Sequence, residues 1–179
     1  AWPGYSFSLH HAAKELLAVT PVESLRERVF QVFGGSTLDE LIEIGGRQAG
    51  NFRLDGFISR PQIQKSNRNS IYLFVNRRLI RDRLLLHAIS SAYHNLMPPA
   101  SYPFALLFVD CDPGEVDVNV HPSKTEVRFR QGSLVHDFVR DSLRETLMAS
   151  RPVASAPSPL PPGQPPQESF PVPGQMAAR

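Results

Sequence analysis

One lysine stands at a polar corner between two alternating apolar runs. The stretch VDVNVHPSKTEVRFRQG, residues 116–132, alternates valines with polar residues and then resumes with Val127 and Phe129, which predicts a short strand on each side of Lys124. Pro122 limits the backbone freedom of this corner. An ammonium held on a stiff support is suited to meet a phosphate as a point charge. Spacing alone nevertheless favours a solvated turn lysine.

A second group of residues that can contact a ligand is basic. Residues 60–83 contain a single acid, Asp82, and seven basic residues: Arg60, Lys65, Arg68, Arg77, Arg78, Arg81 and Arg83. Because the formal net charge of the whole chain is only +2, this local excess, and not the net charge, indicates a basic face that is a candidate for nucleic acid. Composition alone favours a solvated surface without a ligand.

Other kinds of site are not indicated. Cys111 is the single cysteine and lies in an apolar run, so we interpret it as structural. The histidines show no metal-ligand spacing with Cys111, and no metal site is predicted; they are His10, His11, His87, His94, His121 and His136. His121 is more simply a hydrogen-bonded structural residue than a catalyst. The chain has neither a Walker-type phosphate loop nor a GxSxG motif.

The first 60 residues contain recognisable element signals. Residues 7–19 alternate on either side of a polar step, which predicts a hairpin. A capping-box pattern opens residues 24–35 and two glycines end them, which predicts a helix. A second capping box predicts a shorter helix over residues 37–44, again before two glycines. The alternation over residues 52–58 predicts a strand.

The second half continues with short strands and two helices. Residues 71–75 and 104–109 are β-rich apolar runs that predict strands. A helix between them is indicated by an apolar stripe that ends before two prolines: Leu85, Ile89, Ala92 and Leu96. A last helix is predicted over Ser133 to Met148, with six buried residues: Leu134, Val135, Phe138, Val139, Leu143 and Leu147. This order predicts an α+β fold, a mixed β-sheet with helices packed on it.

The chain divides into one domain and a tail. Residues 151–179 contain nine prolines among Ser, Ala, Gly and Gln, which predicts an extended, disordered linker. Residues 1–150 form the domain. The chain begins at Ala1 without methionine and has no signal peptide or long apolar run, so we expect a piece of a larger cytoplasmic protein.

Two stretches resemble one protein family. VDVNVHPSKTEVRF resembles a signature of the MutL DNA mismatch-repair proteins, and FVNRRLIRDRLLLHAI, residues 74–89, resembles a second segment of the same proteins. The similarity is sharp over residues 71–148 and diffuse over residues 6–61, and bacterial members are the nearest match. The resemblance implies the second, transducer domain of the ATPase region, whose fold has a left-handed β-α-β crossover as in gyrase and heat-shock ATPases.

The resemblance also implies residue roles. In the family, the lysine of the HPxK segment, here Lys124, reaches the γ-phosphate of ATP in the adjoining domain. The second arginine of the RDR triplet, here Arg83, belongs to a DNA-binding groove, and Arg77, Arg78 and Arg81 add phosphate contacts. ATP with Mg²⁺ is therefore expected only in the parent protein, because this chain has no counterpart of the catalytic glutamate or the glycine-rich nucleotide lid.

The implied partners are DNA and MutS-like mismatch-repair proteins, without a membrane. We expect the chain alone to be a monomer and the parent to be a dimer. Two alternatives remain open: a structural domain that docks partner proteins, and a related transducer from a topoisomerase or chaperone.

Overall fold

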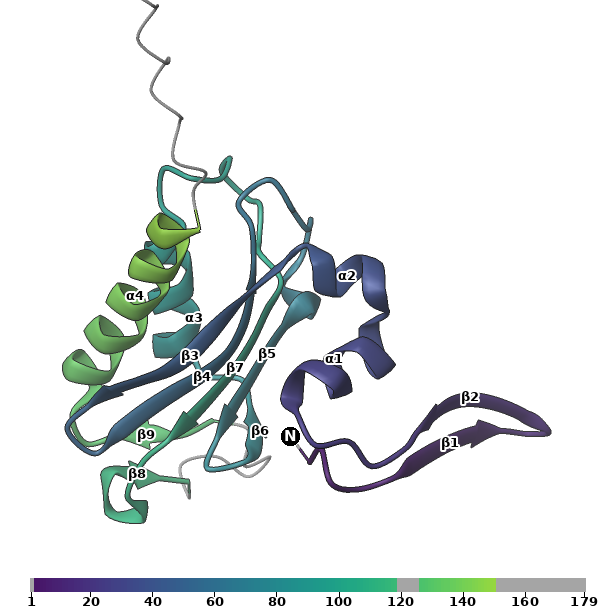
Figure 1. Ribbon diagram of the computed structural model, residues 1–179. Coiled ribbons are helices and arrows are strands. Elements are labelled where there is room, and N and C mark those ends of the chain that lie inside the picture. The colour runs from purple at the N-terminus through teal and green to yellow at the C-terminus, as the bar shows by residue number, and fades with distance from the viewer. Residues whose placement is uncertain (1, 119–125, 151–179) are drawn as a thin grey trace, which may run out of the picture.

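The structure, a computed structural model, describes residues 2–118 and 126–150 and is built on one five-stranded sheet (Figure 1). Its strands lie in the spatial order β3 (Leu41–Ala49), β4 (Phe52–Ser59), β7 (Ala105–Asp110), β5 (Ile71–Val75) and β6 (Arg78–Ile80). β5 and β7 are parallel, whereas the other neighbouring pairs are antiparallel. The chain passes from β5 through β6 and a helix to β7, so a crossover joins the parallel pair. The predicted mixed sheet is confirmed.

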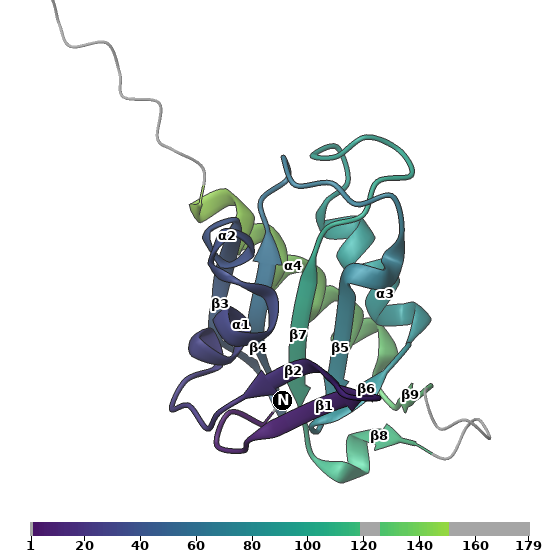
Figure 2. The ribbon, with the colours of Figure 1, turned by 90° about the vertical axis from the view of Figure 1, so that its right-hand side faces the viewer.

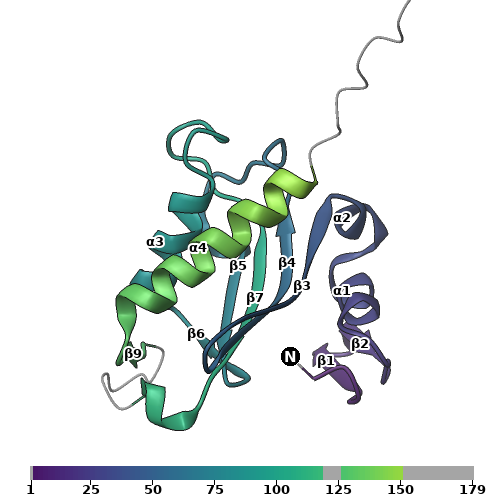
Figure 3. The ribbon, with the colours of Figure 1, turned by 60° about the vertical axis from the view of Figure 1, so that its left-hand side comes forward.

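Helices cover both faces of this sheet. α3 (Arg83–Ala92) and α4 (Gly132–Ala149) pack on one face, and α1 (Leu25–Phe33) and α2 (Gly35–Asp39) lie on the other (Figure 3). The alternation along β7 supplies both layers, because Leu107 and Val109 join the core under α3 and α4 while Leu106 and Phe108 join the smaller core under α1. The segment from β5 to α3 passes through the edge strand β6 and leads into the layer of α3 and α4.

The predicted hairpin is present as β1 (Phe7–His11) and β2 (Lys14–Val19), beside α1 (Figure 2). One buried side chain, Arg28 of α1, holds its base: Nη2 donates hydrogen bonds to the carbonyl oxygens of Pro3, Tyr5 and Thr20. The hairpin itself leaves three large apolar side chains half or more exposed: Phe7, Leu9 and Leu16. Ser24 caps α1 as predicted, accepting from the Glu27 N–H.

The predicted helix over residues 37–44 is wrong. α2 ends at Asp39, and β3 begins at Leu41 because residues 41–49 pair along the whole of β4. The two glycines after Ile44 do not end a helix; they shift the register between Ile44 and Arg47, and the N–H of Gly46 donates to Asp55 Oδ1 over 2.9 Å. Pairing and burial of Leu41 and Ile44 outweigh the local capping signal.

Three details near the other helices also differ from expectation. α3 ends at Ala92, so Leu96 packs on the core from the following loop. Residues 76–78 do not lead directly into α3: Asn76 and Arg77, both with positive φ, form a two-residue turn into β6. Leu134 is 44% exposed, although α4 otherwise matches its predicted extent and buried residues.

The strands expected on either side of the polar corner are confirmed. β8 (Val116–Asp117) pairs antiparallel with β9 (Arg128–Phe129), and Phe129 is buried. Single-turn 3-10 helices lie at Arg68–Ser70 and Pro113–Glu115. Lys124, His121 and the tail from residue 151 lie outside the described residues. In the part that is described, no helix is both long and apolar enough to span a membrane.

Candidate nucleic-acid interface

The four predicted arginines lie on a short path from the β5–β6 turn to the first residue of α3. Arg77, Arg78, Arg81 and Arg83 are all exposed, and within the described residues none of them forms an ion pair. The structure thus presents their guanidinium groups to solvent, where they are available to an anion.

The one acid among them is turned inward. Asp82 is 7% exposed and caps α3, accepting a 3.0 Å hydrogen bond from the N–H of Leu85. Desolvation raises the pKa of the Asp82 carboxyl, while hydrogen bonds from the Leu85 and Leu84 N–H groups oppose that shift. The carboxylate is buried at the helix end and, in the part of the chain that the structure describes, forms no ion pair with any of the four arginines.

The arginines do not form a single cluster. Arg77 lies toward the α1 face, where its Cζ atom is 5.2 Å from the ring centre of Trp2, a cation–π contact. It lines a hollow there with three acids, Glu43, Asp55 and Asp110. Three carboxylates in the same hollow and a ring contact make Arg77 less available to a phosphate than the other three arginines.

Arg81 lies at the edge of the sheet beside Arg68. The two cations border a hollow whose walls are mostly apolar, including Tyr72 of β5 and Leu86 of α3. Arg68 is placed by its own ring contact, with Cζ 5.2 Å from the centre of Tyr102. Arg68 and Arg81 thus extend the basic path to the N-terminal end of β5.

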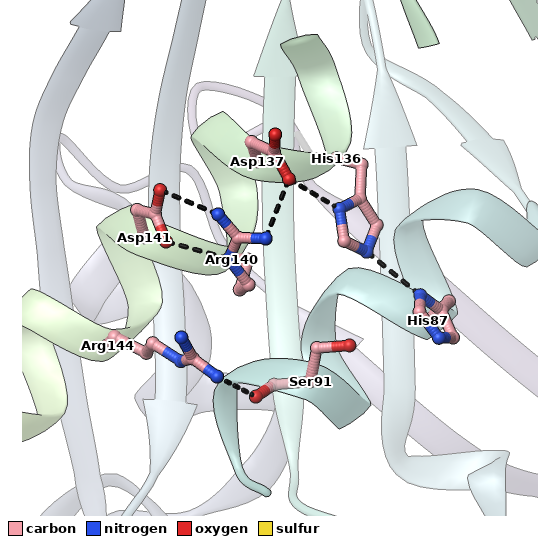
Figure 4. Close-up of polar contacts among 7 residues, drawn as sticks. All are labelled: His87, Ser91, His136, Asp137, Arg140, Asp141 and Arg144. Carbon is pink, nitrogen blue, oxygen red and sulfur yellow. Dashed lines mark hydrogen bonds and ion pairs between the residues drawn. The ribbon is translucent and has the colours of Figure 1, made fainter. Parts of the chain in front are cut away.

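Arg83 lines a third hollow, where α3 and α4 begin. Next to it two histidines meet across the helices: His87 Nδ1 lies 2.9 Å from His136 Nε2, with the ring centres 5.0 Å apart (Figure 4). On α4, His136 Nδ1 is 3.0 Å from Asp137 Oδ1, which also contacts Arg140 Nη1 over 2.7 Å. A cation and a polar chain therefore share one open surface.

Comparisons with known proteins agree with the resemblance noted in the sequence. Residues 29–148 match a family model described as DNA mismatch repair protein, C-terminal domain. The chain belongs to the MutL family of DNA mismatch repair proteins. The MutL of Solibacter usitatus is 59% identical over 94% of this chain and 30% of its own length; that of Acidobacterium capsulatum is 50% identical over 86% and 27%. The chain thus spans less than a third of either relative.

A structural relative supports the same fold. The crystal structure of the N-terminal domain of a DNA repair protein matches with a TM-score of 0.63 at 20% identity, over 76% of this chain and 44% of that one. At this identity the match shows the fold alone. The match supports the predicted α+β class, while the family model and the MutL relatives confirm the predicted resemblance.

Two arginines of this MutL-family chain were not singled out from the sequence. Arg128 and Arg130 are exposed on and just after β9, immediately before α4. The signal was present, because they alternate with the buried Val127 and Phe129 and must point outward. The contact between His87 and His136 gave no such signal, since it depends on how α3 and α4 pack.

The remaining reactive residues do not form a site. Across residues 2–118 and 126–150, no three His, Cys, Asp or Glu side chains are placed to hold a metal ion. Burial raises the pKa of the half-buried Cys111 thiol, which favours the neutral form. The N–H of Cys111 donates to Asn76 Oδ1 over 2.9 Å, so this region tethers the end of β7 to the β5–β6 turn.

Proposed function

We propose that this chain is the transducer and DNA-binding module of a MutL-type mismatch-repair ATPase. The observation that carries the DNA half of the proposal is the exposed arginine path, whose single acid is buried as a helix cap. Exposed guanidinium groups without carboxylate partners contact phosphates irrespective of base sequence. Arg83, Arg81 and Arg78 are assigned to DNA, and Arg77 contributes least because it contacts Trp2.

The nucleotide half of the proposal concerns Lys124. The family resemblance assigns this lysine to the γ-phosphate of ATP, bound with Mg²⁺ in an adjoining domain of the parent. The antiparallel pairing of β8 with β9 supports the assignment, because it fixes the strands that lead into and out of the corner. A lysine delivered across a domain boundary couples nucleotide occupancy to domain arrangement. The left-handed sense of the crossover belongs to the same proposal.

The exposed hairpin is a candidate contact surface for a neighbouring domain. Phe7, Leu9 and Leu16 are each at least half exposed on a two-stranded arm that packs on little besides α1. Exposed large apolar side chains on such an arm mark an interaction surface. We assign this surface to the adjoining ATP-binding domain, with residues 1–150 as the transducer and 151–179 as the linker. The parent is taken to be a cytoplasmic dimer that works with MutS-like partners.

A pure docking domain is the second candidate, and the same exposed hairpin favours it. Binding to duplex DNA separates the two functions. Fluorescence anisotropy with a mixed-sequence duplex should give an affinity that falls steeply with salt, and Arg83→Glu should weaken it about tenfold and lower the salt slope by about one.

The matched control is Arg26→Glu, which makes the same charge change on α1, where Arg26 pairs with Glu43. It should leave binding within about twofold of the wild type. Equal binding by wild type and Arg83→Glu, at every salt concentration, would leave only the docking function.

A further inference from the structure

The hydrogen bond between His87 and His136 constrains where protons can be. Asp137 Oδ1, as a carboxylate oxygen, only accepts, so His136 Nδ1 carries the hydrogen of that 3.0 Å contact. When His136 is neutral, its Nε2 is an acceptor, and His87 Nδ1 must donate to it over 2.9 Å. The second nitrogen of a neutral His87, Nε2, is then an acceptor as well.

One added proton reverses the character of the outer nitrogen. If the pair takes up a proton at His87 Nε2, both internal hydrogen bonds are kept and Nε2 becomes an N–H donor. His87 is exposed and lines the same hollow as Arg83, which precedes it by one turn of α3. An anion in the hollow is therefore opposed by a lone pair in the neutral state and met by a charged donor in the protonated state.

The charges that face the pair come from both helices. On α3 the charged neighbour is Arg83, the first residue of the helix, while Asp82 is buried under it as the cap. On α4, Asp137 and Asp141 are both bound by Arg140, with contacts of 2.7 Å to each (Figure 4). Arg144 is directed away, donating to the Ser91 carbonyl. Asp137 lines the same hollow with its side chain 54% exposed, but its Oδ1 is already engaged by Arg140 and His136, whereas Arg83 has no ion pair within the described residues.

We propose that Arg83, His87 and His136 form a phosphate subsite for the DNA backbone, whose affinity is set by proton uptake at the histidine pair. This inference rests on the proposed DNA-binding function and deepens it. Imidazole is the side chain that ordinarily changes charge between pH 5 and 8, so the subsite makes DNA binding tighter at pH 6 than at pH 8.

The test is duplex-DNA anisotropy on the full chain at constant ionic strength between pH 6 and pH 8. The wild type should bind about fivefold more tightly at pH 6, within the limit of tenfold per pH unit for one linked proton. His87→Gln keeps a polar side chain that does not titrate in this range, and should reduce the change to less than twofold. His94→Gln is the matched control, an exposed histidine just past α3, and should behave as the wild type.

The reciprocal measurement uses ring-nitrogen NMR. If DNA binding takes up a proton, adding the duplex at a fixed pH must increase the protonated fraction of the His87 ring. Two results together would overturn the subsite and leave the DNA function intact: Arg83→Glu weakens binding, and His87→Gln shows the same pH dependence of binding as the wild type. Absence of DNA binding in the wild type at low salt overturns both.

Discussion

The N-cap of α3, Asp82, contributes to the stability of the domain and also lies between two arginines of the basic surface, Arg81 and Arg83. Asp82 is buried and accepts from the N–H of Leu85, which fixes where α3 begins and how Arg83 leaves it. Asp82→Ala removes the acceptor, and the alanine side chain offers no other acceptor for the N–H of Leu85. Loss of an N-cap costs about 1 kcal/mol, with an upper range of about 2 kcal/mol, and burial places this case toward the upper end.

Asp82→Asn separates the cap from the charge. Asparagine caps about as well as aspartate, so the free energy of unfolding at pH 7 should equal or exceed that of the wild type. The pKa of Asp82 is raised in the folded state, chiefly by desolvation. Folding therefore favours the protonated carboxyl: the associated stability is fully present below the unfolded pKa of about 3.9 and is lost as pH rises through the folded value.

Urea unfolding of the two variants and the wild type, from pH 3 to pH 7, tests this reasoning. The wild type should lose stability relative to Asp82→Asn as pH rises through this window, and the difference should then stay constant. If the free energy of unfolding of the wild type instead rose relative to that of Asp82→Asn with increasing pH, the charge itself would stabilise the cap. If Asp82→Ala left the free energy of unfolding unchanged, the hydrogen bond of the cap would not contribute to stability.

Three further changes address the rest of the fold. Gly56→Ala places a Cβ 2.0 Å from the Leu106 carbonyl oxygen at a φ of 144°, so unfolding free energy should fall by at least about 3 kcal/mol in urea titrations; an unchanged midpoint would contradict the close β4–β7 approach. Arg28→Met removes a buried donor to four carbonyl oxygens, and limited proteolysis should then cut at the hairpin base first; equal protection would refute the anchoring role. Tyr93→Phe deletes the hydrogen bond to the Ser59 carbonyl and should cost about 1 to 2 kcal/mol, measured by thermal unfolding; full stability would mean that water replaces the hydroxyl.

Sequence patterns predicted the helices and strands whose local signals agree with their environment. The helix at the C-terminal end of the domain is an example, since its apolar period and its burial coincide over Val135, Val139, Leu143 and Leu147. Leu134 was wrongly expected to be buried: it is 44% exposed because it lies beside the stripe formed by Val135, Val139 and Leu143 and not within it. Residues 41–44 were misassigned because pairing with β4 is a long-range effect that a capping box cannot report.

The candidate site shows the same division. Exposure of the arginines follows from their charge and from the flanking strand and helix, so it was predictable, as was the outward direction of Arg128. The separation of Arg77 from Arg83 was not, because it depends on a turn with positive φ and on the position of Trp2. The His87–His136 contact depends on α3–α4 packing, which joins residues 49 positions apart.

The central claim, that this module couples a nucleotide site to DNA, is tested most directly by ATP turnover. The chain should be joined to the ATP-binding domain of its own parent and assayed with and without duplex DNA, as wild type and as Lys124→Ala. Loss of a single charge that meets the reacting phosphate predicts a fall on the order of 100-fold in turnover, with circular dichroism unchanged. Turnover equal to the wild type, in a folded variant, would contradict the account and reduce Lys124 to a solvated turn residue.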